Sequence, residues 1–152
     1  MAGSRTLPEG EVTIRNAEAD DSRALADLIR ELGFAAEPAE IAARLGHPDQ
    51  AGQMSLIAEK DGEIVGCATL DVMQVLHRPH AVGRISMLIV AQNIRRRGVG
   101  RALVEAAKER LEKAGCGLLE VTSNMDLKQA HAFYESLGFE RTSFRFVKAL
   151  DN

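Results

Sequence analysis

Four arginines lie within the seven residues from Arg95 to Arg101, interleaved with Gly98 and Gly100. An apolar stretch ending at Val90 precedes them, and an amphipathic helical pattern follows. Glycine lets the backbone turn tightly and approach a ligand, and unpaired N–H groups at a helix start attract anions. Arginine adds donors that suit phosphate oxygens. The segment therefore predicts an anion site, with a solvated basic helix start as the alternative.

The two commonest nucleotide motifs do not fit this segment. A dinucleotide-binding fingerprint would place a third glycine where Leu103 stands. A Walker loop would need the Gly-Lys-Ser/Thr sequence, which is missing. The arginine cluster therefore needs a different explanation.

A second group of candidate functional residues lies downstream and supplies that explanation. Asn124 follows an apolar strand pattern, and Tyr134, the only tyrosine, lies in the run AHAFYESLGF at 130–139. Arg95-x-x-Gly98-x-Gly100 resembles the pyrophosphate loop of the GCN5-related N-acetyltransferase (GNAT) superfamily, and this downstream run resembles its second signature. The resemblance extends over roughly residues 12–150, and two correctly spaced motifs are more specific than one.

The resemblance implies acetyl-coenzyme A as cosubstrate. Backbone N–H groups of the arginine loop would hold its pyrophosphate, and the strand ending at Val90 would present its edge to the pantetheine arm. Asn124 would lie near the pantetheine or the thioester, and Tyr134 would be the general acid for the leaving thiolate. The implied cofactor-binding residues are Leu88, Ile89, Val90, Arg95, Arg96, Arg97, Gly98, Val99, Gly100, Arg101 and Asn124.

The implied reaction is transfer of the acetyl group to a primary amine by direct attack in a ternary complex. A faint resemblance to small-amine and aminoalkylphosphonate acetyltransferases, carried by 130–134 and 144–150, favours a small-molecule acceptor. The alternatives are a protein or peptide amine, and a catalytically inactive coenzyme A-binding regulatory domain. The family also makes a homodimer through the C-terminal strands plausible.

The general base has no obvious candidate. Many relatives carry a carboxylate on the strand before the loop, where this chain has Ser86 and Met87. His77, His80 or a water chain are the substitutes, and strand alternation leaves Glu120 on the surface. His77-x-x-His80 lacks a third metal ligand nearby, so a solvated loop is favoured and no metal is expected.

Composition limits the remaining classes of function. The 152 residues suit one domain, and the net charge of −3 disfavours general nucleic-acid binding. No stretch approaches the length of a membrane-spanning helix. Cys67 and Cys116 lie far apart without a partner motif, so no disulfide is predicted. These features predict a soluble, cytoplasmic domain without membrane or nucleic-acid partners.

The elements that position these residues follow from hydrophobic periodicity and from glycine and proline breaks. Strands are expected at 12–15, 54–59, 64–75, 85–90 and 118–122, helices from 20 or 21 to 32, at 38–45, from about 100 to 114 and from 126 or 127 to 137, and a final hairpin or bent strand pair at 139–150. A polar loop is expected at 46–52. The resulting fold is mixed α/β and GNAT-like, a mostly antiparallel sheet flanked by helices in the order β-α-α-β-β-β-α-β-α-β-β. A flexible lead-in at 1–10 would precede one N-acetyltransferase domain at 11–152.

Overall fold

The computed structural model describes residues 5–6, 12–45 and 52–152. Its elements are β1 (Arg5–Thr6), β2 (Thr13–Asn16), the 3₁₀ turn η1 (Ala19–Asp21), α1 (Ser22–Glu31), α2 (Pro38–Leu45), β3 (Gln53–Lys60), β4 (Glu63–Met73), β5 (Ala81–Val90), the 3₁₀ turn η2 (Gln92–Ile94), α3 (Val99–Lys113), β6 (Cys116–Val121) and α4 (Lys128–Ser136). This mixed α/β order confirms the predicted fold class from the first long strand to the last helix.

The strands form one sheet in the order β1-β2-β3-β4-β5-β6. Neighbouring strands are antiparallel up to β5, and β6 is parallel to β5 because α3 provides the crossover between them. The β3–β4 hairpin turns at Asp61 and Gly62, whose φ angles are +52° and +78°. Two consecutive positive φ angles are what a tight hairpin requires, as the Asp-Gly pair predicts.

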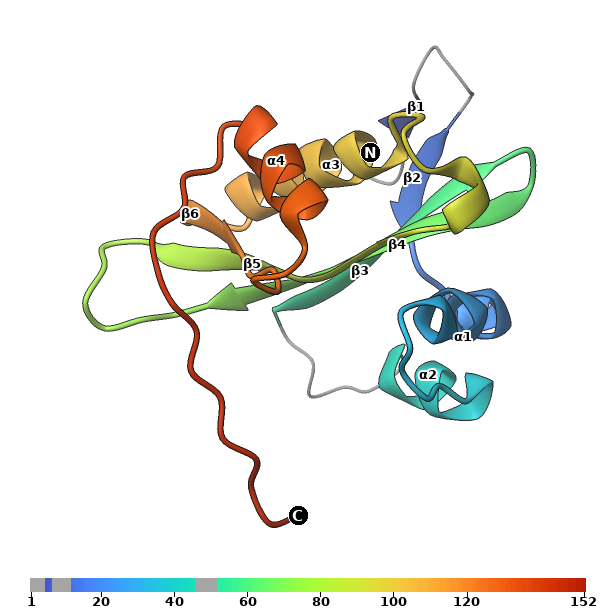
Figure 1. The fold of residues 1–152 in the computed structure, drawn as a ribbon, viewed down its shortest axis with the longest axis horizontal. Coiled ribbons are helices and arrows are strands. Elements are labelled where there is room, and N and C mark those ends of the chain that lie inside the picture. Colours follow the sequence, from blue (N-terminus) through green and yellow to red (C-terminus); the bar gives the residue numbers. More distant parts are fainter. Residues whose placement is uncertain (1–4, 7–11, 46–51) are drawn as a thin grey trace.

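One face of the sheet is closed by α3 (Figure 1). Leu103 and Leu111 of this helix are fully buried against the strands. The helix approaches closely because glycines lie beneath it: a Cβ on Gly83 would lie 2.8 Å from Leu111 Cδ1, and one on Gly66 would lie 3.0 Å from Leu103 Cδ1. The α3 face is thus a tightly packed apolar layer.

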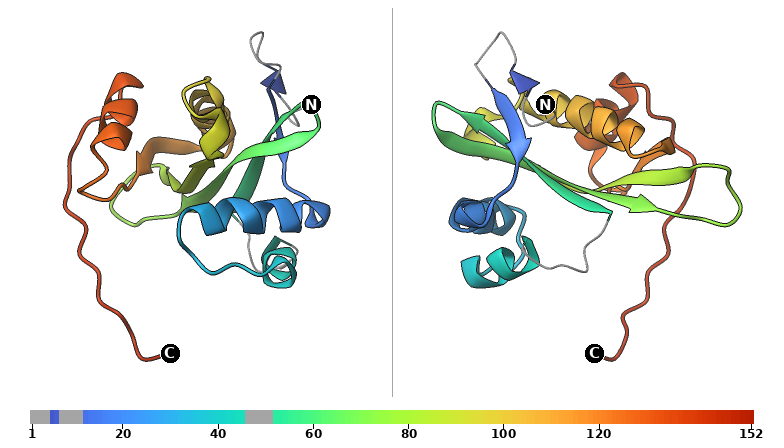
Figure 2. Two further views of the ribbon diagram at one scale, coloured as in Figure 1. Left: turned by 45° about the vertical axis from the view of Figure 1, so that its right-hand side comes forward. Right: turned by 180° about the vertical axis from the view of Figure 1, so that it is seen from behind.

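The opposite face carries α1 and α2 (Figure 2). Their apolar sides pack on Ile57, Cys67 and Ile89, which the strand alternation directs to this face. At the β2–β3 side of the same face, Arg15 donates two hydrogen bonds to Asp21, at 2.8 and 2.9 Å, and a third to Glu59 at 2.8 Å. These bonds fix η1, and therefore the start of α1, to the sheet.

The prediction of terminal strands at 139–150 is wrong. The chain after α4 is extended without a ladder partner among the described residues, and it runs away from β6 (Figures 1 and 2). Alternating apolar side chains favour a strand, but a strand forms only where an edge lies alongside to supply its hydrogen bonds. Phe144, Phe146, Val147 and Leu150 are therefore exposed.

Two further differences concern the beginnings of elements. β5 begins at Ala81, four residues before the predicted start, because it stays paired with β4 as far as Val82 opposite Met73. Within the predicted lead-in, Arg5 and Thr6 pair with Ile14 and Thr13 as the short strand β1. The other residues of the lead-in and most of the predicted 46–52 loop lie outside the described residues.

Candidate active site

The strands β5 and β6 separate partway along their length. Their parallel ladder ends at Ile85 opposite Val121, whereas β5 remains paired with β4 through Val90 opposite Gly66. Residues 86–90 of β5 therefore have one paired edge, toward β4, and one edge that has no strand partner among the described residues. An unpaired strand edge offers N–H and C=O groups to an extended ligand.

The antiparallel ladder determines which backbone groups point to this open edge. The N–H of Ala91 donates to Val65 of β4 at 2.8 Å. Because hydrogen-bonded pairs alternate along an antiparallel ladder, Ile89 also points its N–H and C=O to β4. Leu88 and Val90 point theirs to the open edge. The carbonyl oxygen of Val90 accepts a hydrogen bond from Arg95 Nε at 3.2 Å, so the N–H groups of Leu88 and Val90 and the carbonyl of Leu88 remain for a ligand.

The loop that follows this edge has the geometry of an anion site. Arg96 and Gly98 have left-handed backbone conformations, with φ of +66° and +84°. A non-glycine residue in this region costs about 1–2 kcal/mol, and such strain is often found at ligand sites. The first bond inside α3 joins Ala102 N–H to Gly98 C=O, and no side chain of the described part of the chain caps the helix. The N–H groups at the first turn of α3 thus lack helical partners.

All four arginines of the loop are exposed, whereas Val99 is buried and anchors the helix start in the core. The four arginines are therefore close in sequence to the uncapped start of α3, and their charges are accessible to solvent. Together with the helix dipole they make this end strongly favourable for a polyanion. The predicted pyrophosphate residues thus lie together at the end of the open β5 edge.

Helix α4 packs next to this loop. A Cβ on Gly100 would lie 3.3 Å from Phe133 Cζ, so only a very small residue fits beneath the ring. The neighbouring Tyr134 ring lies edge-on between Phe133 and Phe139, with centroids 5.3 and 5.7 Å away. Its hydroxyl has no hydrogen-bond partner among the described residues. Burial raises the pKa of Tyr134 above its usual value near 10, which keeps the phenol protonated at neutral pH.

Asn124 lies in the connection between β6 and α4, and its side chain has a local role. Its Oδ1 accepts a hydrogen bond from the N–H of Asp126 at 2.9 Å, and its carbonyl oxygen is 2.8 Å from His131 Nε2. These contacts shape the approach to α4. They also occupy His131, which makes it a poor candidate for the missing base. A contact from Asn124 to the pantetheine stays a prediction.

The histidines considered as bases lie at the other end of β5. His77 and His80 are in the β4–β5 connection, and the ring of His80 packs over Gly117 at the start of β6. Six residues of strand, about 20 Å, separate His80 from Ser86. Among the described residues no cluster of His, Cys, Asp or Glu could hold a metal ion. Neither histidine is near the separation of β5 and β6.

The structure reveals a polar strip that the sequence did not. Asp71, Arg84 and Glu120 are register partners across β4, β5 and β6, so their side chains share one sheet face. Next to them on that face, the hydroxyls of Thr69 and Ser86 lie 2.8 Å apart. The sequence offered strand alternation as a signal, but finding the strip also required the register between strands far apart in the chain.

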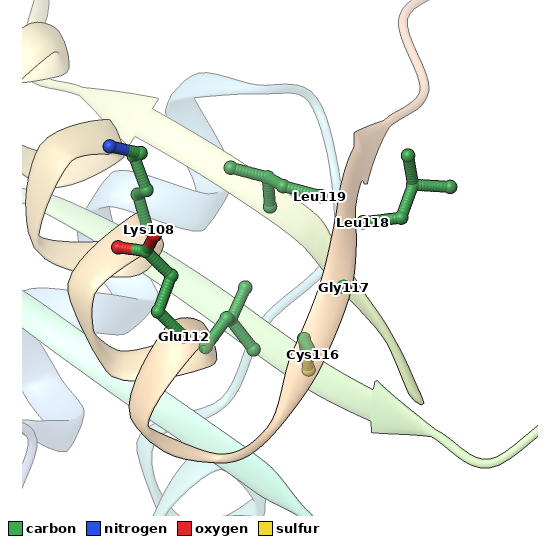
Figure 3. Close-up of a pocket in the computed structure, with 7 residues that line it drawn as sticks. Lys108, Glu112, Cys116, Gly117, Leu118 and Leu119 are labelled. Atoms are coloured by element: carbon green, nitrogen blue, oxygen red, sulfur yellow. The ribbon is translucent and has the colours of Figure 1, made fainter. Parts of the chain in front are cut away.

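A shallow hollow of about 190 Å³ lies elsewhere, between the second half of α3 and β6 (Figure 3). Lys108, Leu111, Glu112, Cys116, Gly117, Leu118 and Leu119 line it. Lys108 lies nine residues into α3, about 13 Å from its uncapped start. The hollow is therefore separate from the loop and from the open β5 edge. Within the described part of the chain, no helix is long and apolar enough to cross a membrane, and cytoplasmic localisation stays a prediction.

Comparisons with known proteins agree with this geometry. The acetyltransferase (GNAT) family model matches residues 20–139. The chain is 32% identical to an aminoalkylphosphonate N-acetyltransferase of Salmonella typhimurium over 142 residues, which cover 90% of each chain. It is 33% identical to an aminoglycoside N(6')-acetyltransferase type 1 of Stenotrophomonas maltophilia, covering 86% of this chain and 87% of that one. An acetyltransferase structure from Trypanosoma brucei superposes with a TM-score of 0.80 at 26% identity, over 92% of this chain and all of the other. The chain belongs to the GNAT acetyltransferase family and is an acyltransferase.

Proposed function

We propose that the protein transfers the acetyl group of acetyl-coenzyme A to a primary amine of a small molecule. The observation that carries this proposal is the continuity of two features, an unpaired β5 edge at 86–90 and the uncapped, arginine-lined start of α3. A pantetheine arm is an extended chain with amide groups, and it ends in a pyrophosphate. The edge and the loop match these two parts in the same order.

In the proposed complex the backbone N–H groups from Arg96 to Arg101 hold the pyrophosphate. The pantetheine arm lies along the open edge, where Leu88 and Val90 are the residues with outward backbone groups. The N–H of Leu88 is then the donor that polarises the thioester carbonyl, in the manner of an oxyanion hole. Ile89 contributes through its buried side chain rather than through its backbone.

Direct attack of the amine on the thioester fits the chemistry of the described residues. An acetyl-enzyme intermediate would need a nucleophile such as a thiolate. Burial raises the pKa of Cys67 to about 12 and also raises that of Cys116, so neither thiol is ionised at neutral pH. Tyr134, protonated and close to the loop, is the donor proposed for the departing thiolate.

Two relatives support a small-molecule acceptor. One is named for aminoalkylphosphonates and the other for aminoglycosides, and this chain covers nearly the whole length of both. Both names describe small amines, which favours this class over a protein or peptide amine. A thiol-release assay with acetyl-coenzyme A across aminoalkylphosphonates, polyamines, aminoglycosides and peptides tests the proposal. Release that depends on a small amine supports it; release with peptides alone, or binding without release, contradicts it.

We also propose that two copies associate through the segment 139–150. This segment exposes Phe144 (82%), Phe146 (92%) and Leu150 (76%), and residues of equal parity share a face in a strand. The outer edge of β6 has no strand partner among the described residues, and the hollow of Figure 3, which three leucines line together with Lys108 and Glu112, lies beside it. Pairing of each segment with the partner's β6 would cover both. Light scattering of the full chain should give twice the 16.5 kDa mass, and Phe144→Ser with Phe146→Ser should give the monomer; a monomeric full chain contradicts the proposal.

A further inference from the structure

The carboxylate of Glu120 lies where β5 and β6 begin to separate. Glu120 is the register partner of Arg84, and only one further pair, Ile85 with Val121, follows before the ladder ends. The open β5 edge begins at the next residue, Ser86. Glu120 therefore lies beside the beginning of the open edge, and its register partner Arg84 is four residues before Leu88, where the proposed function places the thioester.

The register also determines the direction in which Glu120 points. Its ladder neighbours Leu119 and Val121 pack against the α3 core cluster, so the side chain of Glu120 lies on the opposite face of the sheet. This is the face on which α1 and α2 cover Cys67 and Ile89. The strip beyond those residues is polar and half-buried. An acceptor on this face would meet the open edge from the side opposite to α3 and α4.

The charges of this strip are not paired with one another. Arg84 donates to Thr122 Oγ1 at 3.2 Å and makes no ion pair with Glu120 or Asp71 among the described residues. Its Nε is buried and has no hydrogen-bond partner in the described structure. Buried polar groups in folded proteins are nearly always satisfied, so an unsatisfied donor next to a free carboxylate indicates a missing polar ligand.

We propose that Glu120 binds the acceptor's ammonium group and removes its proton, which makes it the base absent from Ser86 and Met87. This inference rests on the proposed function and adds the acceptor side of the same site. The hydroxyls of Thr69 and Ser86 lie on the same face, Ser86 lies between Arg84 and Leu88 in β5, and both hydroxyls provide hydrogen bonds for the acceptor. The site therefore favours an amine with neighbouring polar groups.

The proton balance of the step is as follows. The ammonium transfers one proton to the Glu120 carboxylate and becomes a neutral amine. Its lone pair forms the C–N bond at the thioester carbonyl, and collapse of the tetrahedral intermediate breaks the C–S bond. The sulfur takes the Tyr134 proton, and the second proton from nitrogen returns to the phenolate. Glu120 then releases its proton to solvent, which accounts for the one proton that the reaction produces.

The pH dependence of this step involves few neighbouring charges. On the same face, Arg84 and Asp71 are the ladder neighbours of Glu120. On the opposite face, Lys108 and Glu112 of α3 lie close to the start of β6. A free ammonium loses its proton near pH 10, so a base matters most at neutral pH.

The test compares the pH–rate profiles of Glu120→Gln and Asp71→Asn with that of the wild type, using the amine that reacts fastest in the thiol-release assay. Glu120→Gln should lower kcat/KM about 100-fold at pH 7, and the loss should shrink as pH approaches 10, where solution supplies neutral amine. Asp71→Asn is the matched control, because it removes a carboxylate from the same rung two strands, about 10 Å, away. Its profile should stay within a few-fold of the wild type.

Two further measurements keep a folding defect separate from a lost base. Acetyl-coenzyme A should bind Glu120→Gln with a dissociation constant within about twofold of the wild type, and Glu120→Asp should keep the shape of the wild-type profile at a lower rate. If the wild type is active and Glu120→Gln has the same pH–rate profile, this inference is rejected but the proposed function is not. The same holds if Asp71→Asn loses as much kcat/KM as Glu120→Gln. A wild type without amine-dependent release rejects the proposed function as well.

Discussion

Two arginines on the same sheet face each lie near two carboxylates, and the two clusters differ in how those charges are used. Arg15, at the β2–β3 side, bonds to both Asp21 and Glu59. Arg84, at the β5–β6 side, has Asp71 and Glu120 as ladder neighbours and pairs with neither in the described structure. Each cluster consists of one arginine and two carboxylates, but only Arg15 forms hydrogen bonds with its carboxylates.

This contrast separates a structural role from a chemical one. The saturated cluster joins η1 to the sheet, and Arg15 bonds to both of its carboxylates. In the unsaturated cluster, Arg84 and Glu120 lie where β5 and β6 begin to separate, and their unsatisfied groups cost stability unless a ligand completes them. An unsatisfied buried group requires an explanation, and a ligand site is one. Arg15 and its two carboxylates therefore indicate a scaffold, whereas Arg84 and Glu120 indicate an acceptor site.

The largest expected effect comes from removing the saturated arginine. Arg15→Met leaves Asp21, whose side chain is only 9% exposed, without its partner. We expect a loss of about 2–3 kcal/mol in the free energy of unfolding, below the range for fully buried pairs because Arg15 itself is 29% exposed. Urea unfolding measures the change.

The control for this variant is Arg84→Met. It removes one hydrogen bond and an unsatisfied donor, so the free energy of unfolding should change by less than about 1 kcal/mol. If both variants lose the same free energy of unfolding, both clusters are structural and the contrast between them is wrong.

The second largest effect is expected at an uncharged group, the hydroxyl of Tyr134. The Tyr134 hydroxyl, like Arg84 Nε, has no partner in the described structure, so Tyr134→Phe should leave the free energy of unfolding unchanged or slightly higher. Turnover should fall about 10–100-fold, or roughly 1.4–2.7 kcal/mol, while acetyl-coenzyme A affinity stays nearly intact. Steady-state kinetics with a binding titration check this. Unchanged turnover would remove Tyr134 from the mechanism.

The smallest effect is the pH dependence of the saturated cluster. The hydrogen bonds from Arg15 hold the pKa of Asp21 below its usual value of 3.8. Because the folded pKa is the lower one, the stabilisation is complete above the unfolded pKa near 4 and disappears as pH falls through the folded pKa. Urea unfolding of the wild type and Asp21→Asn should show a gap of about 1 kcal/mol that is constant from pH 7 to 5 and shrinks below pH 4. A gap independent of pH would contradict this cause.

Much of this molecule could be predicted from short-range signals. Gly33, Gly115 and Gly138 follow α1, α3 and α4 with φ near +90°, so the helix ends were visible in the sequence. The arginine loop and Tyr134 were found because each belongs to a local motif with fixed spacing. The structure brings these two motifs together through Phe133 and Gly100.

The parts that sequence could not predict depend on pairing between distant strands. Strand alternation predicts Glu120 on the surface, whereas it is half-buried, and only the register of β5 with β6 places it beside Arg84 near the end of the ladder. The 139–150 segment also shows that strand formation depends on pairing with a distant strand. Its pattern suits a strand, yet no edge of the described chain lies alongside to pair with it.

The central claim is that acetyl-coenzyme A lies along the open edge of β5 and against the start of α3. Hydrogen–deuterium exchange with and without acetyl-coenzyme A tests this claim most directly. We expect slower exchange at the N–H groups of Leu88 and Val90 and across 96–101, with 77–80 unchanged. Protection at the hollow lined by Lys108 and Cys116, without protection at 88–101, would contradict the account.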